Sequence, residues 1–173
     1  MNQLSFQPAF DVYHSSFRFL RIFGYMGSDK SLSLDLVRII DYYLLFFHRM
    51  ESVRLRRADS AIKKLAKQKA ADVRYELQPD DRLLFARMEP FQLSALRTLA
   101  LSGYLDLDGF NNRRVNFLNQ EIPLPLRDRI FEANQKDQDV MEALFAVARE
   151  YPVMGKDGLK DRTGLLEYRY DPV

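Results

Sequence analysis

Aromatic side chains are concentrated at the start of the chain, and this feature constrains the fold most. Eleven of the 22 Phe and Tyr residues lie within the first 47 of 173 positions. They fall in two segments, 10–25 and 34–48, whose periodicity predicts helices. Each segment confines its polar residues to a narrow stripe and is apolar around most of its circumference. Such helices are normally buried in a core or against a partner. We therefore expect a mainly α fold with an N-terminal aromatic helix pair at 1–48.

The polar stripe of the second predicted helix alternates in charge. Asp35, Arg38 and Asp41 recur at i, i+3 spacing, which places them on one face. Two interpretations stay open: other helices of this chain cover the apolar surface, or part of it is a subunit interface, where aromatic residues and Met are favoured. The residues that we expect at such an interface are Phe17, Arg18, Arg38, Asp41, Tyr42 and Phe46.

Charge changes abruptly after the aromatic helices. Residues 49–74 hold nine basic and three acidic side chains, a net charge of +6, whereas the whole chain carries only +2. We predict an exposed basic helix or connector over 49–78. This segment is either a solvated helix face or a contact for an anionic partner, nucleic acid or acidic protein.

Residues 79–119 have the outline of a winged-helix module. Pro79 and Asp80 predict one short helix, Pro90 a second one that ends before Gly103, and a β-hairpin follows with its turn at 108–112. A sequence-reading helix presents several base-contacting side chains, but Arg97 is the only basic residue of the second helix. We therefore favour protein docking over sequence-specific DNA recognition.

The DNA-contact candidates lie in the basic segment and in the predicted wing. Phosphate contacts require Lys and Arg but carry no sequence information, so contact with duplex DNA is expected to be non-specific. These candidates are Arg56, Arg57, Lys63, Lys64, Arg113 and Arg114. The remaining part, 120–173, predicts helices at 126–133 and 137–150 and a last strand at 165–170, and all parts are expected to form one compact domain, 1–173.

The sequence offers little material for catalysis. It contains no Cys and only two His, and no Gly-rich phosphate loop or nucleophile elbow occurs. The acidic pairs Asp80-Asp81 and Asp106/Asp108 could bind Mg²⁺, but negative charge at a helix N-terminus and a place in a turn explain them more simply. We predict a non-enzymatic chain without cofactor or metal. No secretory or membrane-spanning segment is evident, so we expect a cytoplasmic protein.

Four segments, in this order and spacing, resemble the middle components of bacterial ABC-three-component systems. They are 11–20, 34–47, the region from Leu84 to Gly103 with Gln92, and 162–166. The chain departs from the family pattern at Phe47-His48, where the family often has Phe-Pro. The end of the second helix is therefore expected to differ.

This resemblance implies a small adaptor subunit that bridges an SMC-like ABC ATPase and an effector subunit, commonly a nuclease. Such components occur in Lamassu anti-phage and anti-plasmid defence systems. The competing interpretation is a free-standing winged-helix transcription regulator, which requires a homodimer and a specific operator. A third is a small Mg²⁺-dependent nuclease. The weakly basic second helix argues against the regulator.

Overall fold

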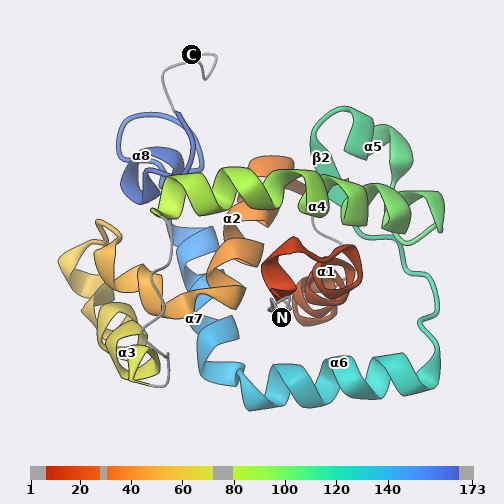
Figure 1. The fold of residues 1–173 in the computed structure, drawn as a ribbon, viewed down its shortest axis with the longest axis horizontal. Coiled ribbons are helices and arrows are strands. Elements are labelled where there is room, and N and C mark those ends of the chain that lie inside the picture. Colours follow the sequence, from red (N-terminus) through yellow and green to blue (C-terminus); the bar gives the residue numbers. More distant parts are fainter. Residues whose placement is uncertain (1–6, 28–30, 72–79, 168–173) are drawn as a thin grey trace, which may run out of the picture.

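The computed structural model describes residues 7–27, 31–71 and 80–167. It is mainly helical with one small antiparallel sheet of two strands, which confirms the predicted fold class (Figure 1). The elements are η1 (Pro8–Phe10), α1 (Val12–Met26), β1 (Ser31–Ser33), α2 (Leu34–Leu45), η2 (Phe47–Ser52), η3 (Arg57–Asp59), α3 (Ser60–Ala70), α4 (Asp81–Leu101), α5 (Leu107–Asn111), β2 (Arg114–Asn116), α6 (Leu124–Lys136), α7 (Gln138–Glu150) and α8 (Leu159–Thr163), where η marks 3-10 helices.

Helix α1 forms where the aromatic pattern predicts it. The Asp11 side chain caps it by accepting a hydrogen bond from the His14 backbone N–H at 2.7 Å, as is typical of an N-cap. Gly27 ends the helix at a φ of +81°, a conformation that glycine adopts without strain. Phe19 and Phe23 are fully buried, so α1 contributes to the core along most of its length.

Helix α2 is the centre of the molecule. All its residues from Leu34 to Tyr43 are buried, and α1, α4 and α7 surround it (Figure 1). Ser33 caps its N-terminus by accepting from the Leu36 N–H at 3.2 Å. The predicted end at His48 is wrong: the helix ends at Leu45 and the chain continues as η2. Phe47 and Met50 are buried in η2, which turns the chain so that both reach the core.

One prediction that fails is the division of residues 80–101 into two helices at Pro90. Helix α4 continues through Pro90, so the structure has no helix–turn–helix in this region. Proline removes the hydrogen bond to the carbonyl of residue i−4, here Ala86. Ala86 and Pro90 are both exposed, so water can hydrate the freed carbonyl. The cost of the broken bond is therefore low enough for the apolar face around Leu96 to keep the helix whole.

Replacing Pro90 by alanine restores the missing N–H donor. We expect Pro90→Ala to raise the free energy of unfolding by about 1–2 kcal/mol, less than the full difference of about 3 kcal/mol between these residues in a helix interior, because α4 already accommodates the proline. Urea unfolding followed by circular dichroism measures this change. A variant that is less stable than the parent chain would show that the packing of α4 depends on the proline.

The small sheet pairs segments far apart in the chain. Strand β1 runs antiparallel to β2, with Leu32 opposite Val115, and Val115 is fully buried. A strand does follow the predicted turn at 108–112, but its main partner is β1 and not the segment that precedes the turn. The predicted hairpin pairing remains as a single bridge between Leu105 and Phe117. The predicted turn at 108–112 is largely occupied by α5, which Asp106 caps.

The basic segment folds against the C-terminal part of the chain. Arg56 stacks on Tyr151, which follows the end of α7, with the guanidinium carbon 4.6 Å from the ring centroid, and Arg162 lies 5.0 Å from the same centroid. The Tyr151 hydroxyl donates to Asp59 and accepts from the Arg56 N–H at 2.8 Å. These contacts anchor the chain on both sides of η3.

The C-terminal helices lie close to their predicted positions, as α6 and α7. The expected last strand at 165–170 is not seen in its described part, 165–167, and its remaining residues lie outside the described ranges. Helix α8 lies just before this segment, and Gly164, which ends the helix, adopts the left-handed conformation. Within the described ranges, none of the helices has the length and apolarity needed to span a bilayer.

Candidate protein-interaction surface

The polar stripes of the two aromatic helices meet inside the molecule. Arg18 of α1 donates from Nε to Asp41 Oδ1 at 2.6 Å and from Nη2 to Asp41 Oδ2 at 3.2 Å. Arg18 also donates to the Ser15 hydroxyl at 3.0 Å and to the Pro8 carbonyl at 2.9 Å. Asp41 is fully buried. A paired and fully hydrogen-bonded charge is the arrangement in which burial is tolerated.

Gln92 extends this network from α2 to α4. Its Nε2 donates to Asp41 Oδ2 at 2.8 Å, and its Oε1 accepts from Arg38 Nε at 3.0 Å. Arg38 forms an ion pair with Glu89 at 2.7 Å and lies 4.6 Å from the centroid of the Phe85 ring. Burial lowers the pKa of Arg38, and the negative charges of Glu89 and Asp35 oppose that shift. The network therefore fastens α1, α2 and α4 together.

Asp35 makes the corresponding link to the C-terminal part. It pairs with Lys160 of α8 at 2.9 Å and with Arg113 at 2.7 Å.

At the other end of α2, the Tyr42 hydroxyl donates to Asp81 at 2.9 Å, and burial raises the pKa of Tyr42. Sequence reasoning missed Gln92 and Lys160 as partners of the stripe, because no local pattern marks them.

Four of the six expected interface residues are thus structural. Arg18, Arg38, Asp41 and Tyr42 lie in the interior of this chain and are not available to a partner in this conformation. The side chains of this stripe pair with one another and with residues of α4 and α8 inside this chain. Phe17 and Phe46 remain half-buried, and Phe17 borders a surface groove.

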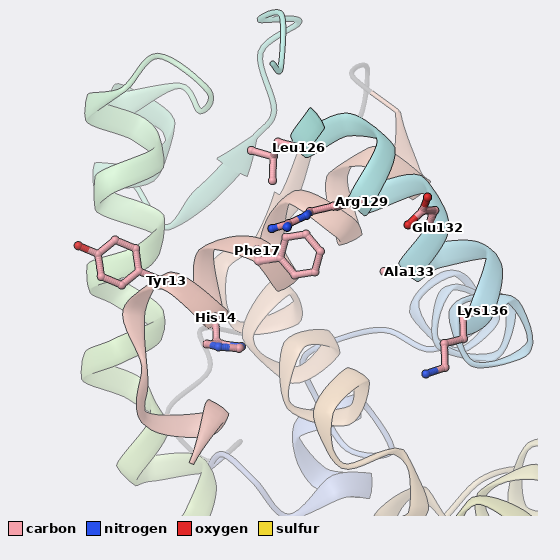
Figure 2. A pocket seen from close by; sticks show the side chains of 8 residues that line it. All are labelled: Tyr13, His14, Phe17, Leu126, Arg129, Glu132, Ala133 and Lys136. Atoms are coloured by element: carbon pink, nitrogen blue, oxygen red, sulfur yellow. The ribbon is translucent and has the colours of Figure 1, made fainter. Parts of the chain in front are cut away.

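This groove lies between α1 and α6 and has a volume of about 620 Å³. Figure 2 shows His14 and Phe17 pointing from α1 toward the side chains of α6, whereas the ring of Tyr13 points away from α6. Tyr13 is 85% exposed, an unusual position for a large aromatic side chain. We call this feature the α1–α6 groove; its lining is Tyr13, His14, Phe17, Leu126, Arg129, Glu132, Ala133 and Lys136.

The groove exists because α6 touches the body of the molecule over a limited stretch. Of its thirteen residues only Ile130 is buried, and a Cβ on Gly24 of α1 would lie 3.2 Å from the Ile130 side chain. Next to this contact, Arg21 pairs with Asp137 at 2.7 Å and donates to Asn134 at 3.0 Å. These contacts attach the C-terminal half of α6 to α1 (Figure 1).

A second groove of about 730 Å³ lies on the other side of α6. Its lining includes Tyr25, which is 39% exposed, and Phe131, which is 64% exposed. Leu124 at the start of α6 is also 56% exposed. Clustered apolar exposure of this kind is typical of interaction surfaces in soluble proteins.

The comparison with known families decides the class of the protein. The family model of the ABC-three component (ABC-3C) system Middle Component 5 matches residues 4–171. The chain belongs to this family. The comparisons with curated proteins and with solved structures found no match. The family confirms the resemblance to ABC-three-component middle components; it makes this chain one component of a system whose other components are its expected partners.

The structure does not bring the DNA-contact candidates of this middle component together. Arg56, Arg57 and Lys64 are exposed and Lys63 is half-buried, all on or before α3. Arg113, by contrast, precedes β2, and Arg114 is the first residue of that strand. Helix α3 and strand β2 lie on opposite sides of the molecule in Figure 1. Arg56 pairs with Asp59 and Glu150, each at 3.2 Å, and Arg114 donates to Ser31 at 3.1 Å.

The acidic pairs considered for Mg²⁺ have structural roles in the middle component. Asp80 caps α4 by accepting from the Arg82 N–H at 3.2 Å, and Asp106 caps α5. In the described part of the chain, His, Asp and Glu form no group of three or more that could hold a metal ion.

Proposed function

We propose that this middle component is a non-catalytic adaptor that bridges an SMC-like ABC ATPase and an effector subunit, a nuclease in the Lamassu-like case, in a cytoplasmic anti-phage or anti-plasmid defence complex. Family membership supports a role within an ABC-three-component system. The observation that carries the adaptor role is the α1–α6 groove with its exposed Tyr13.

The apolar exposure is concentrated where a bridging subunit needs it. Tyr13, Leu124 and Phe131 lie on α1 and α6, and grooves flank α6 on both sides. Interface cores are enriched in aromatic residues, and burying one large apolar side chain contributes roughly 1.5–3 kcal/mol. Two neighbouring grooves offer separate sites for two partners.

Co-expression with the two other components of the system tests this function. We expect the three chains to co-elute from a size-exclusion column, and we expect the ATPase and the effector to separate when the middle component is omitted. An ATPase and effector that co-elute equally well without the middle component would contradict the bridging role. The transcription-regulator alternative needs a separate recognition helix after Pro90, which the structure merges into α4.

A second role, non-specific contact with DNA, is supported by α3 and the short helix η3 before it. Arg57, Lys64 and Lys67 are exposed, Lys63 is half-buried, and none of the four forms an ion pair with another residue of the described ranges. Lys69, by contrast, pairs with Asp139 at 3.0 Å. We propose that α3 contacts duplex phosphates within the assembled complex.

Charge removal on α3 tests the DNA contact. For the complex carrying Lys63→Gln, Lys64→Gln and Lys67→Gln, we expect the slope of log K against log salt to become less steep by about 0.9 for each phosphate that the complex no longer neutralises. Fluorescence anisotropy with a labelled duplex, repeated over a range of salt concentrations, measures this slope. Arg97→Gln, on the exposed face of α4 and away from α3, is the control and should leave the slope unchanged. An unaltered slope in the triple variant would assign the basic face to an acidic protein partner instead.

A further inference from the structure

The rim of the α1–α6 groove carries an ordered row of charges. Arg129, Glu132 and Lys136 follow each other on α6 at i, i+3 and i+7, so they form one stripe along the helix. All three line the groove (Figure 2). Their spacing permits ion pairs within the stripe, yet none of the three pairs with any residue of the described ranges. The row therefore presents positive, negative and positive charge to whatever enters the groove.

The floor of the groove is apolar and lies between two helices. Phe17 is half-buried on α1, Leu126 is half-buried on α6, and the exposed ring of Tyr13 stands at the edge. A groove between helices with an apolar floor and a polar rim is the usual receptor for an amphipathic helix, which inserts its apolar face between them. The charges along the rim then fix the register and direction of that helix.

We propose that the α1–α6 groove binds an amphipathic helix from another component of the system. That helix places apolar residues against Tyr13 and Phe17. It carries carboxylates facing Arg129 and Lys136, which are seven residues and thus about 10.5 Å apart along α6, and a basic residue facing Glu132 between them. This inference rests on the proposed function, which states only that another component binds to this surface.

The charge order argues against two other occupants. A nucleic acid would bring phosphates against Glu132 and would gain nothing from the apolar floor formed by Phe17 and Leu126. A second copy of this chain, docking through its own α6 stripe, would place positive side chains opposite Arg129 and Lys136, and like charges juxtaposed at an interface are unfavourable. A partner helix with negative, positive and negative charge avoids both conflicts.

Charge reversal on the rim is the first test. In the complex with the other two components, we expect Arg129→Glu with Lys136→Glu to weaken binding of one component at least about tenfold, because like charges then face each other. Arg97→Glu is the control, since Arg97 is exposed on α4 and lines neither groove; the affinity of this variant should equal that of the parent chain. Circular dichroism of the parent chain, the doubly reversed variant and the control variant verifies that each is folded.

Photo-crosslinking identifies the occupant. The complex is assembled with benzoylphenylalanine in place of Tyr13, and the crosslinked peptide is sequenced by mass spectrometry. We expect a segment of another component with helical apolar periodicity and carboxylates seven residues apart, and replacing those carboxylates by Lys should restore binding to the doubly reversed chain. Crosslinks to a second copy of this chain or to nucleic acid would overturn the inference, as would a complex of unchanged affinity after charge reversal. Any of these outcomes would overturn the inference about the groove but would leave the adaptor role intact. A parent chain that binds neither of the other components would overturn both the adaptor role and the inference about the groove.

Discussion

Asp41→Ala is expected to lower the free energy of unfolding by about 3–5 kcal/mol, the cost of breaking a buried ion pair by removal of one partner. The substitution leaves the Arg18 guanidinium without its carboxylate, in a site where Asp41 is fully shielded from water. It also removes the nearer of the two acceptors of Gln92 Nε2, which keeps only the Arg38 carbonyl at 3.2 Å. Urea unfolding of the purified chain, followed by circular dichroism, measures the decrease.

Two matched variants show whether the burial of the pair causes this decrease. Asp139→Ala removes a carboxylate that pairs with Lys69 at 3.0 Å but is 47% exposed, so it should cost less than about 1 kcal/mol. Replacing both Arg18 and Asp41 by apolar residues, as Arg18→Met with Asp41→Leu, should recover much of the stability, because no charge is then stranded. If Asp41→Ala costs no more than Asp139→Ala, then the network is not what joins α1, α2 and α4.

Tyr13→Asp is expected to weaken binding of a partner component by at least about 30-fold, which corresponds to about 2 kcal/mol, the threshold for an interface hot spot. Tyr13 is 85% exposed in the isolated chain, so its replacement should leave the free energy of unfolding unchanged. Affinity measured by biolayer interferometry, together with unfolding of the isolated chain, separates the two effects.

Leu101→Asp provides the control for this substitution. Leu101 is also an exposed apolar residue, at 66%, but it lies at the end of α4 and not beside the α1–α6 groove. The Leu101→Asp chain should bind its partners with the affinity of the parent chain. Equally weakened binding in both variants would mean that the groove has no special role and that any apolar surface residue matters.

Local sequence signals predict most of the helices correctly. They fail where contacts with residues distant in the sequence determine the structure. Helices α1 and α2 begin beside Asp11 and Ser33, which are recognisable caps. Pro90 predicts a helix start because a proline is common there, but the apolar face of α4 continues on both sides of it. Sequence alone could not show that the residues around the freed carbonyl are exposed to solvent.

The burial of the polar stripes of α1 and α2 also could not be predicted, because their partners are distant in the sequence. Alternating charge at helical spacing is typical of an exposed face, but Asp41 and Arg38 both bind Gln92, which lies more than 50 positions further along the chain. The α1–α6 groove could not be predicted from the sequence either, since Phe17 and Leu126 on its two sides lie more than 100 positions apart in the chain. Tyr13 and Phe17 are evident in the sequence as aromatic residues of the first helix, but nothing there distinguishes them from buried ones.

Hydrogen–deuterium exchange of the isolated chain and of the assembled complex tests the central claim most directly, namely that the middle component joins its partners through the surface of α1 and α6. We predict that amides of α6 and of the first turns of α1 gain protection in the complex, whereas α2, which is already buried, does not change. Protection that appears on other elements while α6 exchanges as fast as in the isolated chain would contradict this claim.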